Sequence, residues 1–168
     1  MLFLTQYYLI KTKPIIIIIS SCGNITAQKY FTKNGSIAFF SKTAIEDIKA
    51  DNNQVMSVIN TQNGELQFSL LLKGFHFKKA LMEEHFNTDY MESDKFPKST
   101  FKGLITDMTK VNFTQDGTYN VTVTGDLTIH GVTKKVSSGS SINIKSGKIT
   151  GIAKFTVTLS DYAVSIPK

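Results

Sequence analysis

The sequence predicts an all-β domain: an antiparallel, up-and-down barrel of about eight strands with one short inserted helix. Twelve Phe and six Tyr residues, no Trp and many Val, Ile and Thr residues favour strands. Apolar and polar residues alternate along most of the chain, as in a sheet with one solvated face. Eight such strands fit either a sandwich or a closed barrel, and closure removes the exposed edges of the flat Thr/Val strands.

One stretch, residues 78–103, follows helical spacing instead. Met82, Phe86 and Tyr90 recur every four residues and predict a short helix. Pro97 ends this pattern and holds the preceding Phe96 extended. A short helix between strands that ends in an aromatic-proline pair predicts a lid on the β structure.

The expected strands follow one another at short intervals. In the first half they are residues 36–41, 45–50, 55–60 and 65–73, separated by polar turns at 51–53 and 61–64. In the second half they are residues 100–113, 118–130, 136–144 and 149–159. The clearest alternation lies in 118–130, where one face carries Tyr119, Val121, Val123, Gly125, Leu127 and Ile129.

Three small residues on inward-facing rows bear on what fills the barrel. A barrel of about eight strands is either filled by side chains or holds one small ligand. Gly125, Gly151 and Ala153 indicate an interior that is not fully packed, although strand glycines also mark bends and bulges.

The first 27 residues have a different composition from the rest. They are mostly apolar, with Lys11, Lys13 and five consecutive Ile residues at 15–19. No apolar run reaches the ~20 residues that span a bilayer, so we predict a secretory signal at 1–27, cleaved after Ala27. Residues 28–168 would then form one domain of a periplasmic or secreted protein.

Cys22 is the only cysteine, so the domain 28–168 has no disulfide. Residues 19–22, ISSC, resemble a bacterial lipobox, in which Cys22 would be lipidated and become the first mature residue. The alternative is a chance cysteine in a discarded signal.

The charge pattern argues against nucleic-acid binding. The net charge is +6, and removing Lys11 and Lys13 with the signal leaves 17 basic and 13 acidic residues, a net charge of +4. The basic residues are scattered, whereas nucleic-acid binding needs a clustered stripe with stacking aromatics. A weak peripheral attraction to anionic membranes stays open.

Three segments carry motifs that resemble one known family. The first begins with a His before a large apolar residue, here His85-Phe86, followed by an acidic residue with bulky neighbours, Asp89-Tyr90-Met91. It ends with an aromatic-proline pair, Phe96-Pro97, and a Phe four residues after the proline, Phe101. The second is GDLTIHGVTK at 125–134, and the third is Ser160-Asp161-Tyr162, with departures at Leu159 and Ala163. Together they resemble the YceI-like polyisoprenoid-binding family of secreted bacterial proteins over residues 35–167.

The resemblance implies a lipocalin-like barrel with a long apolar pocket for a polyisoprenoid, an isoprenoid quinone or a similar lipid, and binding or carriage without chemistry. Family members usually continue past the Ser-Asp-Tyr segment into a last strand that helps close the barrel. This chain stops at Lys168, so we expect either a truncated sequence or a barrel open on one side. An open edge would favour a homodimer.

The strand faces and the expected lid predict which residues contact the lipid. Residues on the strand faces are Phe39, Phe68, Leu70, Phe101, Tyr119, Val121, Leu127, Ile129, Phe155 and Val157. Residues near the mouth are Phe86, Tyr90 and Phe96.

Candidates for catalysis are weak. The three His residues, at 76, 85 and 130, have no partner at metal-ligand spacing, and no nucleophile motif occurs, so we expect no metal, no cofactor and no enzyme. We expect His85 and His130 to be structural and to bond loop carbonyls. The alternatives are a solid-cored adhesion module that binds a protein through Thr-rich strands and, more weakly, a lipid-modifying enzyme that uses His85 and Asp89.

Overall fold

The computed structural model describes residues 6–12, 29–42 and 47–165. Nine strands lie within these ranges: β1 (Gln6–Thr12), β2 (Lys29–Lys42), β3 (Asp47–Asn60), β4 (Glu65–Leu71), β5 (His76–Phe77), β6 (Lys98–Ile105), β7 (Gly117–Ile129), β8 (Val132–Lys145) and β9 (Lys148–Val157). The helical elements are η1 (Leu72–Gly74), α1 (Ala80–His85), the π-helical turn η2 (Phe86–Tyr90), η3 (Met108–Lys110) and η4 (Leu159–Tyr162).

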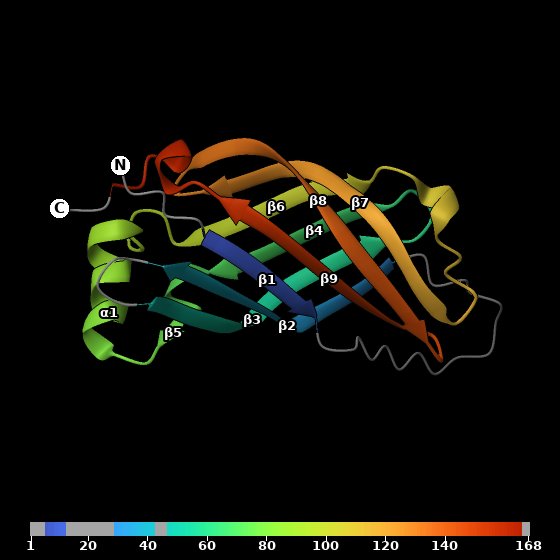
Figure 1. Cartoon of the computed structure of the whole chain (residues 1–168), viewed down its shortest axis with the longest axis horizontal. Coiled ribbons are helices and arrows are strands. Elements are labelled where there is room, and N and C mark those ends of the chain that lie inside the picture. Colours follow the sequence, from blue (N-terminus) through green and yellow to red (C-terminus); the bar gives the residue numbers. More distant parts are fainter. Residues whose placement is uncertain (1–5, 13–28, 43–46, 166–168) are drawn as a thin grey trace.

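Eight strands form an antiparallel ring in the order β2-β1-β9-β8-β7-β6-β4-β3, and β2 pairs with β3 to complete it. The short β5 pairs with β3 beside this ring. Figure 1 shows the strands as an elongated barrel with α1 at one end. The predicted fold class, an all-β up-and-down barrel with one short inserted helix, is confirmed.

The ring closes through β1, a strand from within residues 1–27. β1 pairs with β2 from Gln6 opposite Ser41 to Thr12 opposite Gly35, and with β9 from Gln6 opposite Val157 to Lys11 opposite Ile152. This is the gap that we expected a C-terminal strand to fill. The predicted signal at 1–27 therefore contains a segment that the structure places in the sheet, and its cleavage stays a prediction.

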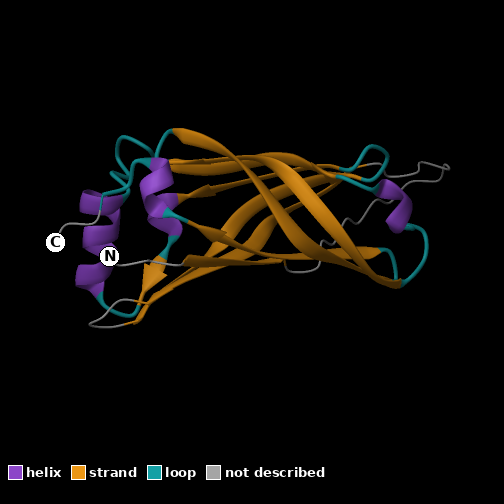
Figure 2. Cartoon of the chain, turned by 45° about the horizontal axis from the view of Figure 1, so that its top comes forward, coloured by secondary structure: helices purple, strands orange, loops and turns teal. Residues whose placement is uncertain are grey.

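Helical elements lie at both ends of the barrel. Figure 2 shows α1 and η2 beyond one end of the strands and η3 beyond the other. The predicted helix therefore exists at the expected place, but its regular part is short, and none of its residues is fully buried.

The inward rows agree with the alternation in the sequence. On β7, Val121, Val123, Leu127 and Ile129 are buried, and residues between them point outward. The same holds for Phe68 and Leu70 on β4. Strand alternation was therefore a reliable guide to which side chains face the core.

The turn predicted at 51–53 is wrong, because β3 runs through these residues. Asn52 is fully buried, its side-chain amide donates to the Leu71 carbonyl at 2.9 Å, and its oxygen accepts from the Gln54 amide at 2.8 Å. The β2–β3 register shifts nearby, around Gly35 and Val55. A polar residue that we took as a turn signal thus satisfies the backbone at a bulge inside a long strand.

The strand predicted at 100–113 ends early, at Ile105. Asp107 accepts a hydrogen bond from the Thr109 amide at 3.2 Å and caps η3. A side chain that bonds the backbone two residues later favours a turn over continued pairing.

Gly125 does not leave the empty space that its inward position suggested. It lies opposite Gly103 across the β6–β7 pair, and a Cβ atom at Gly125 would stand 2.7 Å from the Phe101 ring. The ring of Phe101 covers both glycines, so the glycines allow close approach instead of marking a cavity.

Candidate functional site

The barrel encloses a cavity of about 90 Å³ near its middle. Among the residues whose side chains the structure describes, six strands line it: β3 and β4 with Ser57, Ile59, Leu66 and Phe68, β6 and β7 with Phe101, Ile105 and Val123, and β8 and β9 with residues between Val136 and Phe155. The lining is almost entirely apolar, and its polar groups are serine hydroxyls. The described lining includes no ionisable side chain.

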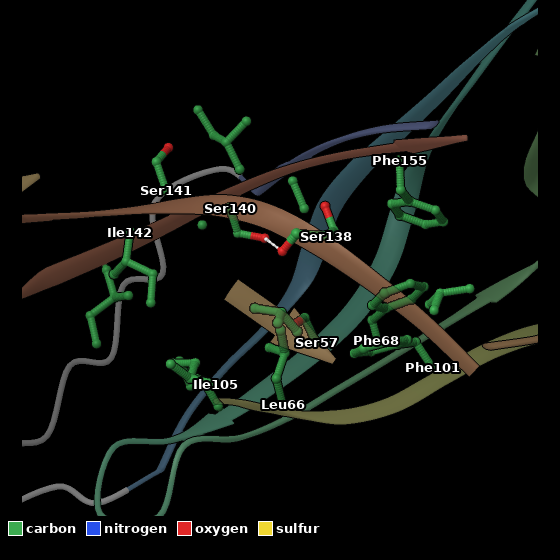
Figure 3. A pocket seen from close by; sticks show the side chains of 17 residues that line it. Ser57, Leu66, Phe68, Phe101, Ile105, Ser138, Ser140, Ser141, Ile142 and Phe155 are labelled. Carbon is green, nitrogen blue, oxygen red and sulfur yellow. Dashed lines mark hydrogen bonds between the residues drawn. The ribbon is translucent and has the colours of Figure 1, made fainter. Parts of the chain in front are cut away.

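Two aromatic rings form the densest part of the lining. Phe68 on β4 and Phe101 on β6 are register partners, and their rings stack with centroids 5.1 Å apart and 14° between their planes. Figure 3 shows these two rings together, with Phe155 facing them from β9. The three rings give the cavity an apolar surface at this side.

The opposite side of the cavity is built from small residues. Ser138 and Ser140 of β8 and Gly151 and Ala153 of β9 face the interior, and Ser140 lies directly opposite Ala153. Because none of these side chains is longer than a hydroxymethyl group, they leave space that Val or Ile would fill. Gly151 and Ala153 therefore do what we expected of inward small residues, whereas Gly125 does not.

A second cavity of about 20 Å³ lies toward the end that carries α1. Its lining includes Leu72, Phe75 and Met91, and it shares Phe68 and Phe155 with the main cavity. These two phenylalanines therefore separate two adjacent apolar spaces. Rotation of either ring would join the two.

Aromatic packing closes the barrel at the α1 end. The Phe86 ring stacks on Phe39 with centroids 5.7 Å apart, and lies 5.5 Å from Phe75 and 5.0 Å from Phe77. Such pairs stabilise a contact beyond the area that they bury. The predicted lid is thus a plug whose anchor is Phe86.

The predicted contact residues fall into three groups. Phe68, Phe101 and Phe155 line the main cavity. The second cavity is lined by Phe39, Leu70, Phe86, Leu127 and Ile129, again with Phe68 and Phe155. Five residues line neither of these cavities: Val121 and Val157 are buried in the core, and Tyr90, Phe96 and Tyr119 are partly exposed.

Sequence reasoning missed the small-residue side of the cavity. Ser138 and Ser140 lie on the same face of β8 as Val136 and Ile142, so strict alternation would have placed them inward. Serine usually marks a solvated face, so residue type argues against an inward position here. Ile105 and Ile142 were also missed, although both line the cavity; Ile149, on the inward row that alternation predicts for 149–159, lines it too.

The histidines bond carboxylates, not the loop carbonyls that we expected. His85 Nδ1 lies 2.6 Å from Asp89 Oδ2 on the exposed surface of the helix. This hydrogen bond, and next the one from the Thr88 hydroxyl, holds the pKa of Asp89 below its ordinary value. His130 is nearly buried, with Nε2 2.8 Å from Glu92 Oε2 and its ring against Phe96 at 4.4 Å.

These polar pairs lie away from the cavity, since none of their residues lines it. Among the residues that the structure describes, no group of His, Cys, Asp and Glu is arranged to hold a metal ion. Within the same ranges, no helix is long and apolar enough to cross a membrane.

Comparison with known proteins agrees with this architecture. A family model of the YceI-like domain matches residues 25–168. Structural neighbours include a polyisoprenoid-binding domain from Saccharophagus degradans implicated in plant cell wall breakdown (TM-score 0.63, 11% identity, 96% of this chain and 80% of that chain covered). The YceI protein of Campylobacter jejuni aligns with a TM-score of 0.55 at 19% identity over 73% of this chain and 75% of that one. BcnA of Burkholderia cenocepacia aligns with a TM-score of 0.51 at 14% identity over 97% and 83%.

A search of curated protein sequences found no match. The fold and the cavity define a β-barrel protein with an apolar interior site. The family match covers most of the chain, and the chain belongs to the YceI-like domain family. The resemblance drawn from the motifs is thereby confirmed.

Proposed function

We propose that the protein binds and carries a long apolar lipid, of the polyisoprenoid or isoprenoid-quinone class, inside its barrel. The observation that carries the proposal is the apolar cavity of about 90 Å³, which adjoins a second apolar cavity across Phe68 and Phe155. The polyisoprenoid-binding domain among the structural neighbours supports this ligand class.

The size of the cavities sets how binding would proceed. Small-molecule sites usually measure about 300–1,000 Å³, so the main cavity holds only part of a long chain. The remainder would enter the second cavity once Phe68 or Phe155 rotates. A chain of linked isoprene units suits such a route, because it is narrow and needs contacts along its length.

The energetics require no polar anchor. Burial of about 10 methylene groups at ~0.8 kcal/mol each contributes about 8 kcal/mol before ordering costs, which corresponds to roughly micromolar affinity. The described lining residues, with serine hydroxyls and no ionisable side chain, suit binding of an apolar chain.

Extraction of the purified protein tests the proposal. Organic extracts read by mass spectrometry should contain a long-chain apolar lipid in near-stoichiometric amount. Delipidated protein should then take up geranylgeraniol, a C20 isoprenoid alcohol, more tightly than geraniol, its C10 counterpart. A well-folded protein that is empty and takes up neither alcohol would contradict carriage and favour the adhesion module.

We also propose that residues 28–168 act in the periplasm or outside the cell. The apolar composition of residues 1–27, ending in Ile25-Thr26-Ala27, supports this. Intact-mass measurement of the native protein should show loss of about 27 residues, or of 21 with a lipid on Cys22. Full-length, unmodified cytoplasmic protein would contradict export.

A further inference from the structure

The β8–β9 pair stops partway along the barrel. The two strands pair from Lys145 opposite Lys148 up to Ser140 opposite Ala153. Beyond that point β8 continues to Val132 beside β7, while β9 continues to Val157 beside β1. Figure 1 shows the two strands leaving their hairpin together and then diverging. The barrel wall is therefore split between Val132–Gly139 and Lys154–Val157, a region that we call the β8–β9 split.

A side chain bridges the split next to the last paired residues. The Ser138 hydroxyl donates to the Lys154 carbonyl at 2.8 Å. In a continuous sheet a backbone amide would donate here. A hydroxyl on one rotatable bond is easier to displace than a ladder of backbone hydrogen bonds, because only one group has to move.

The exposure of inward-facing residues shows where solvent reaches the cavity. On the side opposite the split, Phe68, Phe101 and Val123 are buried, and Leu66 is partly exposed. At the split, the inward-facing Val136, Ser138 and Phe155 are partly exposed although they line the same cavity. The cavity is therefore accessible from the side of the barrel.

A depression on the outer surface meets the cavity beside the split, at the last paired residues of the β8–β9 hairpin. It measures about 470 Å³, and Gly139 and Lys154 are among the residues that line it. Ser140, Ser141 and Ile152 line both the depression and the cavity. The Ile152 side chain is 40% exposed, so the outer side already presents an apolar surface.

The two ends of the barrel are packed. At the α1 end, Phe86 lies among three other phenylalanines, and Leu72 and Met91 are buried beneath it. At the other end, Ile105, Ile144 and Ile149 are buried, and Met108 of η3 packs against Gly64. Entry through either end would displace several buried side chains, whereas the split is bridged by the Ser138 hydroxyl and flanked by η4, which packs against β8.

We propose that the β8–β9 split is a lateral portal through which the apolar chain of a lipid enters and leaves the cavity, with the Ser138 hydroxyl as its latch. This inference rests on the proposed function and concerns the 1–168 chain, in which β1 pairs with β2 and β9. The chain would slide from the outer depression past Ser138 and Ser140 into the space beside Ala153. A lateral route lets the chain enter side-on, and the head group stays in the outer depression.

A reversible cross-link across the split tests the portal. In a Cys22→Ser background, Gly139→Cys and Lys154→Cys place two outward-facing cysteines where the register would continue. The matched control combines Asn143→Cys with Thr150→Cys. These two residues face outward and lie opposite each other where β8 and β9 are paired. Both pairs are closed by oxidation to the disulfide, and closure is verified by intact mass.

The readout is the rate at which delipidated protein takes up anthraniloyl-tagged geranylgeraniol from phosphatidylcholine vesicles. Closing the split should slow uptake at least tenfold, and reducing the disulfide should restore it. The control pair should behave alike when closed and open. Equal uptake by the closed and open split variant would overturn the portal while leaving the proposed function intact. No uptake by any variant, open forms included, would overturn both.

A second variant works without cross-linking. Ser138→Ala removes the latch hydroxyl and should speed uptake and release by about fivefold, the factor that one ordinary hydrogen bond represents. Ser137→Ala, which loses the hydroxyl contact with Thr124 on the outer face of the same strand, is the control and should not change the rate. Unchanged rates of lipid uptake and release in Ser138→Ala would contradict the role of the Ser138 hydroxyl as a latch.

Discussion

Asn52 is a fully buried polar residue whose side chain serves two backbone groups. It bonds the Leu71 carbonyl and the Gln54 amide, so replacing Asn52 by Ala leaves both without their partner. We expect Asn52→Ala to lower the free energy of unfolding by about 2–3 kcal/mol, measured by denaturant titration. The neighbour Asn53, whose amide bonds Asp51 at the surface, is the control. Asn53→Ala should change stability by less than about 0.5 kcal/mol. Similar losses in both variants would contradict this role of Asn52.

A larger side chain at Ala153 tests whether the cavity volume is needed for lipid binding and not for stability. It lies on the small-residue side of the cavity, so Ala153→Leu adds three carbon atoms to empty space of about 90 Å³. Denaturant midpoints of the delipidated protein should change by less than about 1 kcal/mol, while uptake of geranylgeraniol should fall at least tenfold. Gln67→Leu on the outer face of β4, away from the split, should leave uptake unchanged. Loss of stability with normal uptake would mean that the cavity is not the lipid site.

At the scale of single elements, the success of sequence reasoning depended on what determines each one. The inward face of β7 follows from alternation alone, because one solvated face repeats every two residues. The continuation of β3 through Asn52 could not be predicted, since it depends on a bond to Leu71, 19 residues away. The β8–β9 split could not be predicted either, because strand pairing depends on register and Ser138 looks the same in paired and unpaired strands.

The element η4 brings a tyrosine into the core. Tyr162 is 3% exposed, and its burial, with a smaller contribution from the charge of Asp161, raises its pKa. The phenol is neutral below its ordinary pKa of about 10, so its packing contribution is complete there and is lost as pH rises through the raised value. We expect Tyr162→Phe to flatten the fall in unfolding midpoint above about pH 10. Tyr119→Phe, at a partly exposed tyrosine, should retain the parent slope. An equally steep fall in Tyr162→Phe would show that other groups govern alkaline unfolding.

At the scale of the whole molecule, β1 decides whether the barrel has edges. It lies outside the residues that the family model matches, yet it pairs with β2 and β9. Removing residues 1–27 would leave both neighbours with unpaired backbone groups, and such edges recruit other chains. In sedimentation experiments, the 28–168 protein should form dimers or larger species, while the 1–168 protein stays monomeric. Monomeric behaviour of both proteins at high concentration would mean that β2 and β9 meet without β1, or that the edges are covered.

The position of β1 also affects the order in which the barrel folds. Its pairing with β9 joins Gln6 to Val157, positions at nearly opposite ends of the chain, whereas β7, β8 and β9 pair with sequence neighbours. Contacts between distant residues carry the largest loop-closure cost and form late. We therefore expect refolding followed by far-UV circular dichroism to show a main phase that builds an open sheet and a slower phase that closes it. The slower phase should be absent from the 28–168 protein. Until closure, the chain is a curved sheet with a free strand at each side, and this interval is when misassembly with a second chain is most favoured.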